Sequence, residues 1–473
     1  MSSSPLTILA GIISQGVQDL ESAYSNHGLS FPSLDEPFKP GPLDDNPELG
    51  AATRLIVAAA YQIIATVRPP LETIQDYAPA MYLTSSLGLI DEINVADALK
   101  DAGPQGLHVK DISTKTGVVD SVKLGNVIVK SIFWLGRYLI LSRLVARVLR
   151  YLASRHVFQE VAPDIYANNR ISSILVKSKP LEELKKDKLT KYEDAPAAAF
   201  VGHVADEAFK GAAYLSSYIK DEPTDVDTPW NIATGRKGSI WQWYEEPDNV
   251  WRYHRFTAAM KGGADRFPST IYTESFDWKS LAPDSVVVDV GGNVGKVTHE
   301  LYKAFPHLKF VIQDLPPVVE DAKSFWAEVA PHAVKDDRVR LEAHDFFQPQ
   351  TTKEPAAYVL RLILHDWADS PSVTILKNLR ATAMPNTRLL VFEGVMPHVC
   401  PTPGGPPPPP SPLLGNLGAG MGAFITMLDL QMFTVFNGQE RTVEQFSALG
   451  SVTGWKLEAV NPGPLTAFIF APE

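Results

Sequence analysis

The chain has 473 residues, a formal net charge of −11 and a single cysteine, Cys400. This length is enough for more than one domain. The negative charge argues against a general nucleic-acid-binding surface, and one cysteine excludes a framework of disulfides within the chain. No charged, apolar and small-residue signal opens the sequence, so we expect a cytosolic protein.

The amino-terminal half is predicted to be mainly helical. Residues 1–50 are expected to form a flexible lead-in, because Ser33–Pro47 is rich in proline and aspartate. Leu55–Val67 is an apolar helical stretch that should end before the prolines that follow it. Met81–Leu99 predicts further helices, with a break at Gly88.

Residues 51–230 are predicted to form one helical domain that contains a winged helix. Val109–Thr116 and Ala146–Phe158 resemble two of its helices, and residues 161–169 resemble the wing. A winged helix can bind DNA, but the acidic charge of the chain does not favour that use.

A glycine-rich turn follows a valine-rich strand in residues 286–300. Three valines lead into Asp289, the turn contains Gly291, Gly292 and Gly295, and a helical pattern begins after it. This is the pattern of a nucleotide-binding βαβ unit, although an ordinary tight turn has similar glycines. No Gly-Lys-Ser/Thr follows, which excludes a phosphate loop. A carboxylate just before the glycines repels a pyrophosphate but accepts hydrogen bonds from a cationic or amino-bearing ligand, so the pattern favours S-adenosylmethionine over NAD.

Acidic and aromatic residues lie at the ends of the next two predicted strands. Leu308–Leu315 carries Asp314 at its end, where a carboxylate can accept hydrogen bonds from two ribose hydroxyls. The alternative for Asp314 is a solvated aspartate at a strand end. Val339–Phe347 places Asp345 and Phe346 at a third strand end, where an acidic group beside an aromatic plane suits an adenine ring.

The following strand carries the candidate for proton transfer. Ala357–Leu364 is almost wholly apolar and leads into His365, which should emerge at the carboxyl edge of a parallel sheet, where ligands of such sheets bind. Histidine suits the removal of a proton near neutral pH. Glu393 and Glu440 could flank the ring, and a carboxylate can hold one tautomer and stabilise the imidazolium. A lone histidine is more often a packing residue, but its place in this series of strand ends favours catalysis.

Six motifs together resemble one enzyme family. DVGGNVG, QDLPPVV, HDFF, LRLILHDW, VFEGVMP and NGQERT occur in the order and at the spacing of small-molecule O-methyltransferases that depend on S-adenosylmethionine, the plant caffeic-acid and flavonoid type and their fungal relatives. His156–Leu175 is most similar to the fungal polyketide branch, to which sterigmatocystin O-methyltransferase belongs. The resemblance covers about Leu55 to Phe470.

The resemblance implies a fold and partners. The fold is an α/β, Rossmann-like methyltransferase domain with a mostly parallel seven-stranded sheet in residues 231–473, preceded by a mainly helical winged-helix dimerisation domain. It also implies a homodimer, S-adenosylmethionine, and a phenolic or polyketide-like acceptor from fungal secondary metabolism, with no nucleic acid or membrane partner. No metal is expected, since His299-Glu300 lacks a second histidine at helical spacing.

Residue roles also follow from the resemblance. His365 would be the general base that deprotonates a phenolic hydroxyl, with Glu393 and Glu440 flanking it. The implied cofactor residues are Asp289, Gly291, Gly292, Asp314, Leu315, Asp345 and Phe346, and Arg361 stands where plant members often carry a cofactor-contacting lysine. The implied acceptor residues are Trp241, Met260, Asp366, Met427, Met432 and Asn437.

Two segments depart from the family pattern. Residues 125–145 add 21 residues to what is otherwise a continuous helix. They are long enough to cross a bilayer, but three basic side chains make that costly. We favour a retained intron, because deletion restores the family helix; the alternative is a lineage-specific helix. Residues 401–412 contain five consecutive prolines and predict a surface loop.

Two other functions stay open at this point. One is a catalytically silent, S-adenosylmethionine-binding winged-helix regulator, which would be expected to lose the base. The other is an N-methyltransferase or protein methyltransferase, because a neutral amine needs less help from a base. The presence of His365 with both carboxylates favours the O-methyltransferase.

Overall fold

The computed structural model describes residues 4–118, 131–220, 228–264, 267–401 and 407–473. The chain divides into two compact units: a helical unit of Met1–Ala264 with His398–Ala423, and a sheet unit of Asp265–Pro397 with Phe424–Glu473. The sequence placed the boundary near residue 230. The later boundary arises because α15 (Val250–Ala264) packs closely on α10 (Pro196–His203), where a Cβ at Gly262 would lie 2.2 Å from Pro196.

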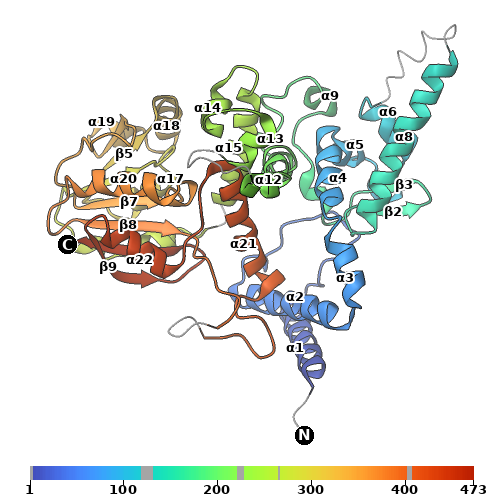
Figure 1. Ribbon diagram of the computed structural model, residues 1–473, viewed down its shortest axis with the longest axis horizontal. Coiled ribbons are helices and arrows are strands. Elements are labelled where there is room, and N and C mark those ends of the chain that lie inside the picture. The colour runs from blue at the N-terminus through green and yellow to red at the C-terminus, as the bar shows by residue number, and fades with distance from the viewer. Residues whose placement is uncertain (1–3, 119–130, 221–227, 265–266, 402–406) are drawn as a thin grey trace. The chain divides into compact units, whose positions relative to one another are not determined.

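The sheet unit is built on seven strands in the order β6-β5-β4-β7-β8-β10-β9. β10 pairs antiparallel with β8 and β9, and the other pairs are parallel. The predicted α/β fold with a mostly parallel seven-stranded sheet is therefore confirmed (Figure 1). The strands are β4 Val286–Val290, β5 Lys309–Asp314, β6 Val339–Ala343, β7 Ala357–Arg361, β8 Arg388–Glu393, β9 Trp455–Asn461 and β10 Thr466–Pro472.

Both faces of this sheet are buried, which explains the continuous apolar runs in its strands. Successive side chains alternate between two core clusters: Val287 belongs to one and Val288 to the other. Trp326 of α18 packs in the first cluster and Leu379 of α20 in the second. The helices of this unit are α16 Thr270–Thr273, α17 Lys296–Ala304, α18 Pro316–Val329, α19 Pro331–Lys335, α20 Asp369–Arg380 and α22 Val443–Ser451, with α21 Gly422–Gln431 at its boundary and a π-helix at Met432–Phe436.

Five parallel strands end at the same edge of the sheet. The register pairs Asp289 of β4 with Ile312 of β5 and Val359 of β7, so the segments that follow these strands are neighbours. The strand predicted to reach residue 364 ends at residue 361, because Leu362 adopts a positive φ of 52°. The chain then forms a short 3-10 helix, Leu364–Asp366, which carries the predicted base.

The flexible lead-in predicted for residues 1–50 is wrong, because an ordered helix lies within it. Residues 5–26 form helix α1, which packs on α2 (Pro47–Val67). Leu9 is 1% exposed and packs with Ala58 of α2, and Gly16 allows the helices to approach, because a Cβ there would lie 2.6 Å from Ile56. Packing of the apolar face of α1 therefore orders residues 5–26, although the segment that follows them is rich in proline.

The next helices are α3 (Pro70–Tyr77), α4 (Met81–Glu92) and α5 (Val95–Leu99). The break predicted at Gly88 is wrong: α4 runs through it, and the missing Cβ allows a close approach to Ala205. The break lies at Asn94, whose φ is 57°. Within the described ranges, α2 is the one helix with the length and hydropathy to cross a membrane.

A winged-helix arrangement follows. β1 (Leu107–His108), β3 (Ile165–Ala167) and β2 (Gln159–Ala162) form an antiparallel sheet in that order, and β2 and β3 form the predicted wing. α6 (Val109–Lys115) and α8 (Ser131–Ala153) are its helices. The second helix ends five residues earlier than predicted, because the chain after it takes positive φ angles at residues 156 and 158.

The segment 125–145 is partly within α8. Residues 125–130 lie outside the described residues, and from residue 131 the helix runs without interruption past Ala146. Val145 and Ala146 are buried in the same core as Leu149 and Leu152. The retained intron and the lineage-specific helix both stay predictions, which sequencing of the transcript across this region would separate.

The rest of the helical unit consists of short helices and one loop. Residues 402–406 of the proline-rich loop lie outside the described residues; its end is anchored on α2, where Gln62 Nε2 donates to the carbonyl oxygen of Pro412 at 2.6 Å. The remaining α-helices are α9 Leu181–Leu184, α11 Phe209–Ala212, α12 Leu215–Lys220, α13 Pro229–Thr234 and α14 Ile240–Glu245, with a π-helix at Val204–Ala208.

Candidate active site

The glycine turn after β4 is shaped for close approach of a ligand. Gly291 has a φ of 65°, and a Cβ there would lie 2.6 Å from Ile363 and 3.5 Å from Phe346. Gly295 has a φ of 86° and packs against Ile312 of β5. The turn therefore needs glycine for both backbone conformation and space. Asn293, at a φ of 53°, is one of the few residue types that tolerate this region.

Asp289 lies beneath this turn. It is 2% exposed, its carboxylate accepts a hydrogen bond from Thr298 Oγ1 at 2.7 Å, and a Cβ at Gly292 would lie 2.7 Å from it. Burial raises the pKa of Asp289 to about 6. The sequence suggested direct contact with the ligand; this geometry favours support of the turn.

The ends of β5 and β6 present polar and aromatic groups at the same edge. Asp314 accepts hydrogen bonds from the backbone nitrogens of Asn293 and Leu315, both at 2.8 Å, so it fixes the turn to the start of α18. Asp345 accepts from the backbone nitrogen of Phe347 at 2.9 Å. The predicted cofactor residues are thus brought together, and Asp314 still has lone pairs for ligand hydroxyls.

Arg361 ends β7 between the glycine turn and the base. Its Nε donates to the Tyr272 hydroxyl at 3.1 Å, and its guanidinium lies 5.7 Å from the centre of the Phe267 ring. Nη2 is buried without a hydrogen-bond partner among the described residues. A buried unpaired cationic donor is costly, so this atom suits an anionic group of a ligand.

The His365 ring is held by one carboxylate. Its Nδ1 lies 2.9 Å from Glu440 Oε1, and its Nε2 lies 3.6 Å from Asp366 Oδ1. When Nδ1 donates to Glu440, Nε2 carries the lone pair that accepts a proton. The side chain of His365 is 14% exposed, while that of Glu440 is 1% exposed.

Charge around His365 raises its pKa. Burial lowers the pKa, but the carboxylates of Asp366, Glu393 and Glu440 outweigh burial and raise it to about 10. At a pKa of about 10, the imidazolium is the favoured form of His365 near neutral pH, so only the neutral fraction of the ring can accept a proton.

The hydrogen bonds of Glu393 go to the main chain and not to the imidazole ring. Its Oε1 accepts from the backbone nitrogens of Ile363 and Leu364 at 2.9 and 2.8 Å. Its Oε2 is buried without a hydrogen-bond partner among the described residues, and burial raises its pKa to about 7. The sequence predicted that Glu393 flanks the imidazole; its charge does act on the ring, since it raises the pKa of His365, while its hydrogen bonds support the turn that carries His365.

Arg441 is a site residue that the sequence did not reveal. It follows Glu440 directly, is 1% exposed, and donates from its guanidinium to the carbonyl oxygens of Leu364 and Trp367 at 2.6 and 2.8 Å. Its position in the NGQERT motif was a signal, but contacts to main-chain carbonyls about 75 positions away leave no sequence pattern.

The predicted acceptor residues divide between the units. Trp241 and Met260 belong to the helical unit, where Trp241 packs edge-on against Phe256. Met427, Met432 and Asn437 belong to the sheet unit; Met427 is 37% exposed and Met432 only 5%. Met432 is therefore largely buried within its own unit, and the acceptor roles of all these residues stay predictions.

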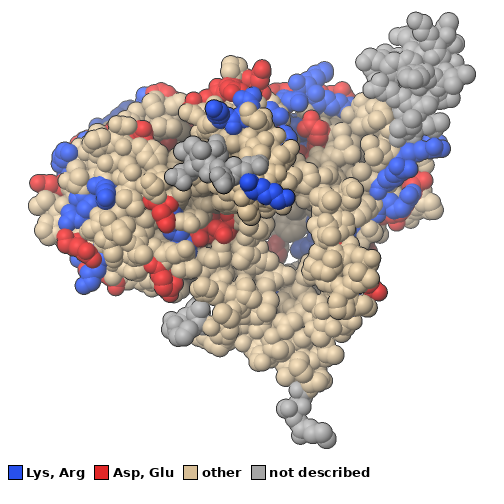
Figure 2. Space-filling view, viewed as in Figure 1, with Lys and Arg blue, Asp and Glu red and all other residues tan. Residues whose placement is uncertain are grey.

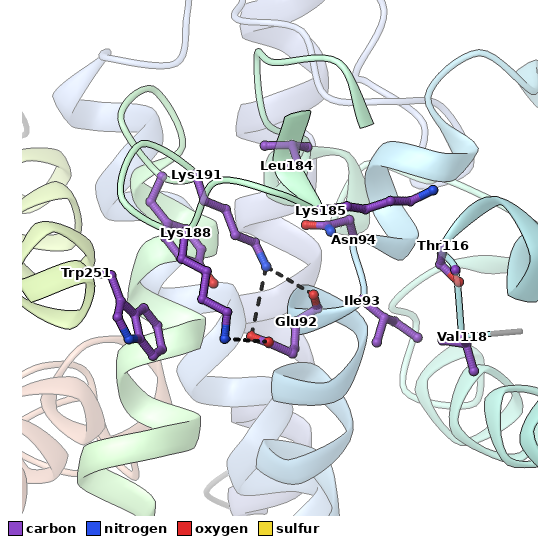
Figure 3. Close-up of a pocket in the computed structure, with 12 residues that line it drawn as sticks. Glu92, Ile93, Asn94, Thr116, Val118, Leu184, Lys185, Lys188, Lys191 and Trp251 are labelled. Atoms are coloured by element: carbon purple, nitrogen blue, oxygen red, sulfur yellow. Dashed lines mark hydrogen bonds and ion pairs between the residues drawn. The ribbon is translucent and has the colours of Figure 1, made fainter. Parts of the chain in front are cut away.

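A cavity of about 340 Å³ lies in the helical unit (Figure 3). Lys188, Lys191 and Trp251 contribute to its wall, and the Lys191 ammonium donates to the carbonyl oxygens of Asp91 and Glu92 at 3.1 Å. None of the predicted site residues is in its described lining. Because its lysines already have protein partners, the cavity offers no built anion site.

Comparison with known proteins identifies the family. A model described as an O-methyltransferase domain matches residues 213–404. An O-methyltransferase of Armillaria gallica is 36% identical, covering 99% of each chain. The chain belongs to the O-methyltransferase family. Sterigmatocystin 8-O-methyltransferase of Aspergillus flavus is 28% identical, over 85% of this chain and 81% of that one, so the predicted family and its fungal polyketide branch are confirmed.

A solved structure supports the fold. NcsB1, an O-methyltransferase from neocarzinostatin biosynthesis solved with S-adenosylmethionine and 2-hydroxy-5-methyl naphthoic acid, superimposes with a TM-score of 0.58 at 20% identity. The match covers 83% of this O-methyltransferase and 96% of NcsB1. At this identity the likeness shows the fold alone.

Proposed function

We propose that this O-methyltransferase methylates a phenolic hydroxyl of an aromatic secondary metabolite, with His365 as the general base. The methyl donor is S-adenosylmethionine, and acceptors in this branch are secondary metabolites. The observation that carries the proposal is the 2.9 Å contact between His365 Nδ1 and Glu440, at the same sheet edge as the glycine turn.

The residues at this edge fit the donor. The main chain at Gly291 leaves room where a Cβ would collide, Asp314 can accept from ribose hydroxyls, and Phe346 offers an aromatic plane beside the turn. The unpaired Nη2 of Arg361 fits a carboxylate such as that of the methionine portion. When bound, S-adenosylmethionine supplies a methyl group already activated by a sulfonium.

The protein then has two tasks: to align the acceptor oxygen and to take up its proton. Glu440 holds Nδ1 of His365, which leaves Nε2 to accept the phenolic proton, and Glu440 and Asp366 stabilise the imidazolium that results. A positioned base contributes about a hundred- to ten-thousand-fold in rate. Among the described residues, no group of three His, Cys, Asp or Glu side chains is arranged to hold a metal.

A phenolic acceptor is supported by its chemistry. A phenolic hydroxyl must lose its proton on methylation, which gives His365 a proton to accept; a neutral amine needs less help from a base. The regulator and the N-methyltransferase are not favoured, because the Armillaria gallica and Aspergillus flavus relatives are O-methyltransferases and the His365–Glu440 pair is intact.

The test is methyl transfer by a His365→Ala protein. Isothermal titration with S-adenosylmethionine establishes that the variant still binds the donor, and labelled donor with a panel of hydroxylated aromatics measures transfer. We expect donor affinity near that of the wild type and a rate about 100- to 10,000-fold lower. Full-rate methylation of a phenol by this variant would remove the base from the proposal.

We also propose a homodimer formed through the helical unit. Apolar side chains are exposed in series on α2 to α4, and on the face shown in Figure 2 the surface over α1, α2 and α3 is almost free of charged residues. Patches of this kind mark protein interfaces. The exposed side chains are Tyr61, Ile64, Val67, Leu71, Ile74, Tyr77, Met81 and Tyr82. Light scattering should give twice the monomer mass for the wild type and the monomer mass for Ile74→Glu.

A further inference from the structure

The turn that carries His365 is held by two buried ionisable side chains, Glu393 and Arg441. Glu393 accepts from the backbone nitrogens of Ile363 and Leu364. Arg441 Nη1 donates to the carbonyl oxygen of Leu364 at 2.6 Å, and Nη2 donates to that of Trp367 at 2.8 Å. The 3-10 helix is thus fixed through both its donors and its acceptors.

Arg441 is unusual as a buried cation. Its side chain is 0% exposed, and among the described residues its carboxylate partner is Asp369, whose side chain is 71% exposed, at 2.9 Å. Its other hydrogen-bond partners are the carbonyl oxygens of Leu364 and Trp367 and Ser372 Oγ at 3.3 Å. Burying a charge costs free energy that exposed pairing offsets poorly. The planar fork of arginine, however, can hold several fixed points at once, which a lysine cannot.

The loop that contains Arg441 also delivers the carboxylate that holds the ring. Gln439 donates from its backbone nitrogen to the carbonyl oxygen of His365 at 2.9 Å, and a Cβ at Gly438 would lie 2.2 Å from that oxygen. Glu440 then reaches Nδ1 of the ring. The carbonyl oxygen of Arg441 accepts from the backbone nitrogen of Met396 at 3.0 Å, which ties the loop to the segment after β8.

We infer that Arg441 is a positioning residue for methyl transfer: its guanidinium fixes the His365 turn relative to the adjacent Glu440, so that the contact between Glu440 and the ring keeps its alignment and Nε2 keeps its direction. This inference rests on the proposed role of His365. A small misplacement of a catalytic group costs about a hundredfold in rate, so loss of this grip should appear in turnover before it appears in binding.

The alternative is that Arg441 only stabilises the fold at the start of α20. Arg380 provides a matched control, because its guanidinium also donates to main-chain carbonyls of the sheet unit, those of Gly454 and Glu473, both at 2.8 Å. Those carbonyls belong to the segments around β9 and β10, away from the His365 turn. A stabilising role would make Arg380→Lys and Arg441→Lys alike.

The experiment compares Arg441→Lys, Arg441→Met and Arg380→Lys in the full chain. For each protein we measure melting temperature, S-adenosylmethionine affinity, and kcat and KM for one phenolic acceptor from pH 6 to 10. The lysine variant keeps the charge and carries the test if the methionine variant does not fold. We expect Arg441→Lys to lower kcat about 10- to 100-fold with donor affinity within about threefold, and Arg380→Lys to keep its kcat.

The pH profile separates positioning from simple stabilisation. The groups facing His365 are Asp366, Glu393 and Glu440. Glu440 raises the pKa of His365, so a loosened Glu440 in Arg441→Lys would move the acid limb of kcat to lower pH.

A double variant tests whether Arg441 and Glu440 act together. In Arg441→Lys combined with Glu440→Gln, kcat should fall little below that of the worse single variant, because both changes act through one pair.

Two results would overturn the inference. One is an unchanged kcat and acid limb in Arg441→Lys; the other is a double variant whose losses multiply. Failure of the proposed function looks different, because His365→Ala itself would then retain its rate. Inactive His365→Ala together with an unaffected Arg441→Lys would reject only the role of Arg441.

Discussion

The edge of the sheet unit has two halves that work differently. After β4, β5 and β6, the groups predicted to face the ligand are backbone and partly exposed side chains, such as Phe346 and Leu315, which is 49% exposed. After β7 and β8, the groups are ionisable and buried: Glu393 is 0% exposed and Glu440 4%. The first half is shaped to admit a ligand, and the second is a fixed array of charge, since electrostatic stabilisation works best when it is preorganised and dry.

The largest effect is expected when the charge of the half that follows β7 and β8 is removed alone. Glu440→Gln keeps the shape but loses the charge that orients and stabilises the ring. We expect kcat to fall about 1,000-fold, with S-adenosylmethionine affinity unchanged, as for other histidines that lose their orienting carboxylate. Rapid-quench methylation and isothermal titration measure the two quantities.

An exposed carboxylate supplies the control for that variant. Glu458 on β9 pairs with Arg388 at the surface, and Glu458→Gln should leave both quantities within about twofold. If Glu440→Gln lost S-adenosylmethionine affinity by the same factor as kcat, the two halves of the edge would not have separate functions.

A change in the half that follows β4, β5 and β6 should weaken donor binding more than it lowers kcat. In Gly291→Ala, the new Cβ would lie 2.6 Å from Ile363 at a φ of 65°. We expect the dissociation constant for S-adenosylmethionine to rise about 10- to 100-fold, from backbone strain and crowding together, while kcat at saturating donor falls much less.

Gly235 separates strain from crowding in that experiment. It has the same φ of 65° but nothing within 4 Å of a new Cβ, and it lies in the helical unit. Gly235→Ala should lower the melting temperature without changing donor affinity. Equal donor affinity in Gly291→Ala and the wild type would contradict the proposal that the donor binds against the main chain at Gly291.

The smallest effect concerns the stability of the charged half. Burial raises the pKa of Glu393 from 4.5 to about 7, so the folded state disfavours its charged form and stability is lost as pH rises from about 4.5 to about 7. Glu393→Gln lacks this loss. The free energy of unfolding of the variant minus that of the wild type, measured in urea titrations, should therefore be about 1–3 kcal/mol larger at pH 8 than at pH 5. A difference independent of pH would contradict the buried charge.

The sequence predicted the elements whose signals are local. Three valines before a glycine turn, and an apolar run before His365, were enough for β4, β7 and their shared edge. The sequence did not predict α1, because the Pro- and Asp-rich stretch that follows it hides the signal of its apolar face. The predicted helix break at Gly88 is wrong because the close contact with Ala205, which requires a glycine, leaves no mark in a one-dimensional pattern.

The network around the base could be predicted only in part. Glu440 was found because its motif is recognisable, but the hydrogen bonds of Glu393 go to backbone nitrogens about 30 positions away, and those of Arg441 to carbonyls about 75 positions away. Such contacts depend on the register of β7 and β8 and on how the loop 437–441 lies against the turn. Residue type alone does not determine either.

The most direct test of the central claim is chemical rescue of His365→Gly by imidazole. With S-adenosylmethionine and a phenolic acceptor both saturating, we predict a single-turnover rate about 100- to 10,000-fold below the wild type that rises with imidazole concentration and with the basicity of substituted imidazoles. A variant that methylates the phenol at the wild-type rate without added imidazole would contradict the assignment of His365 as the base.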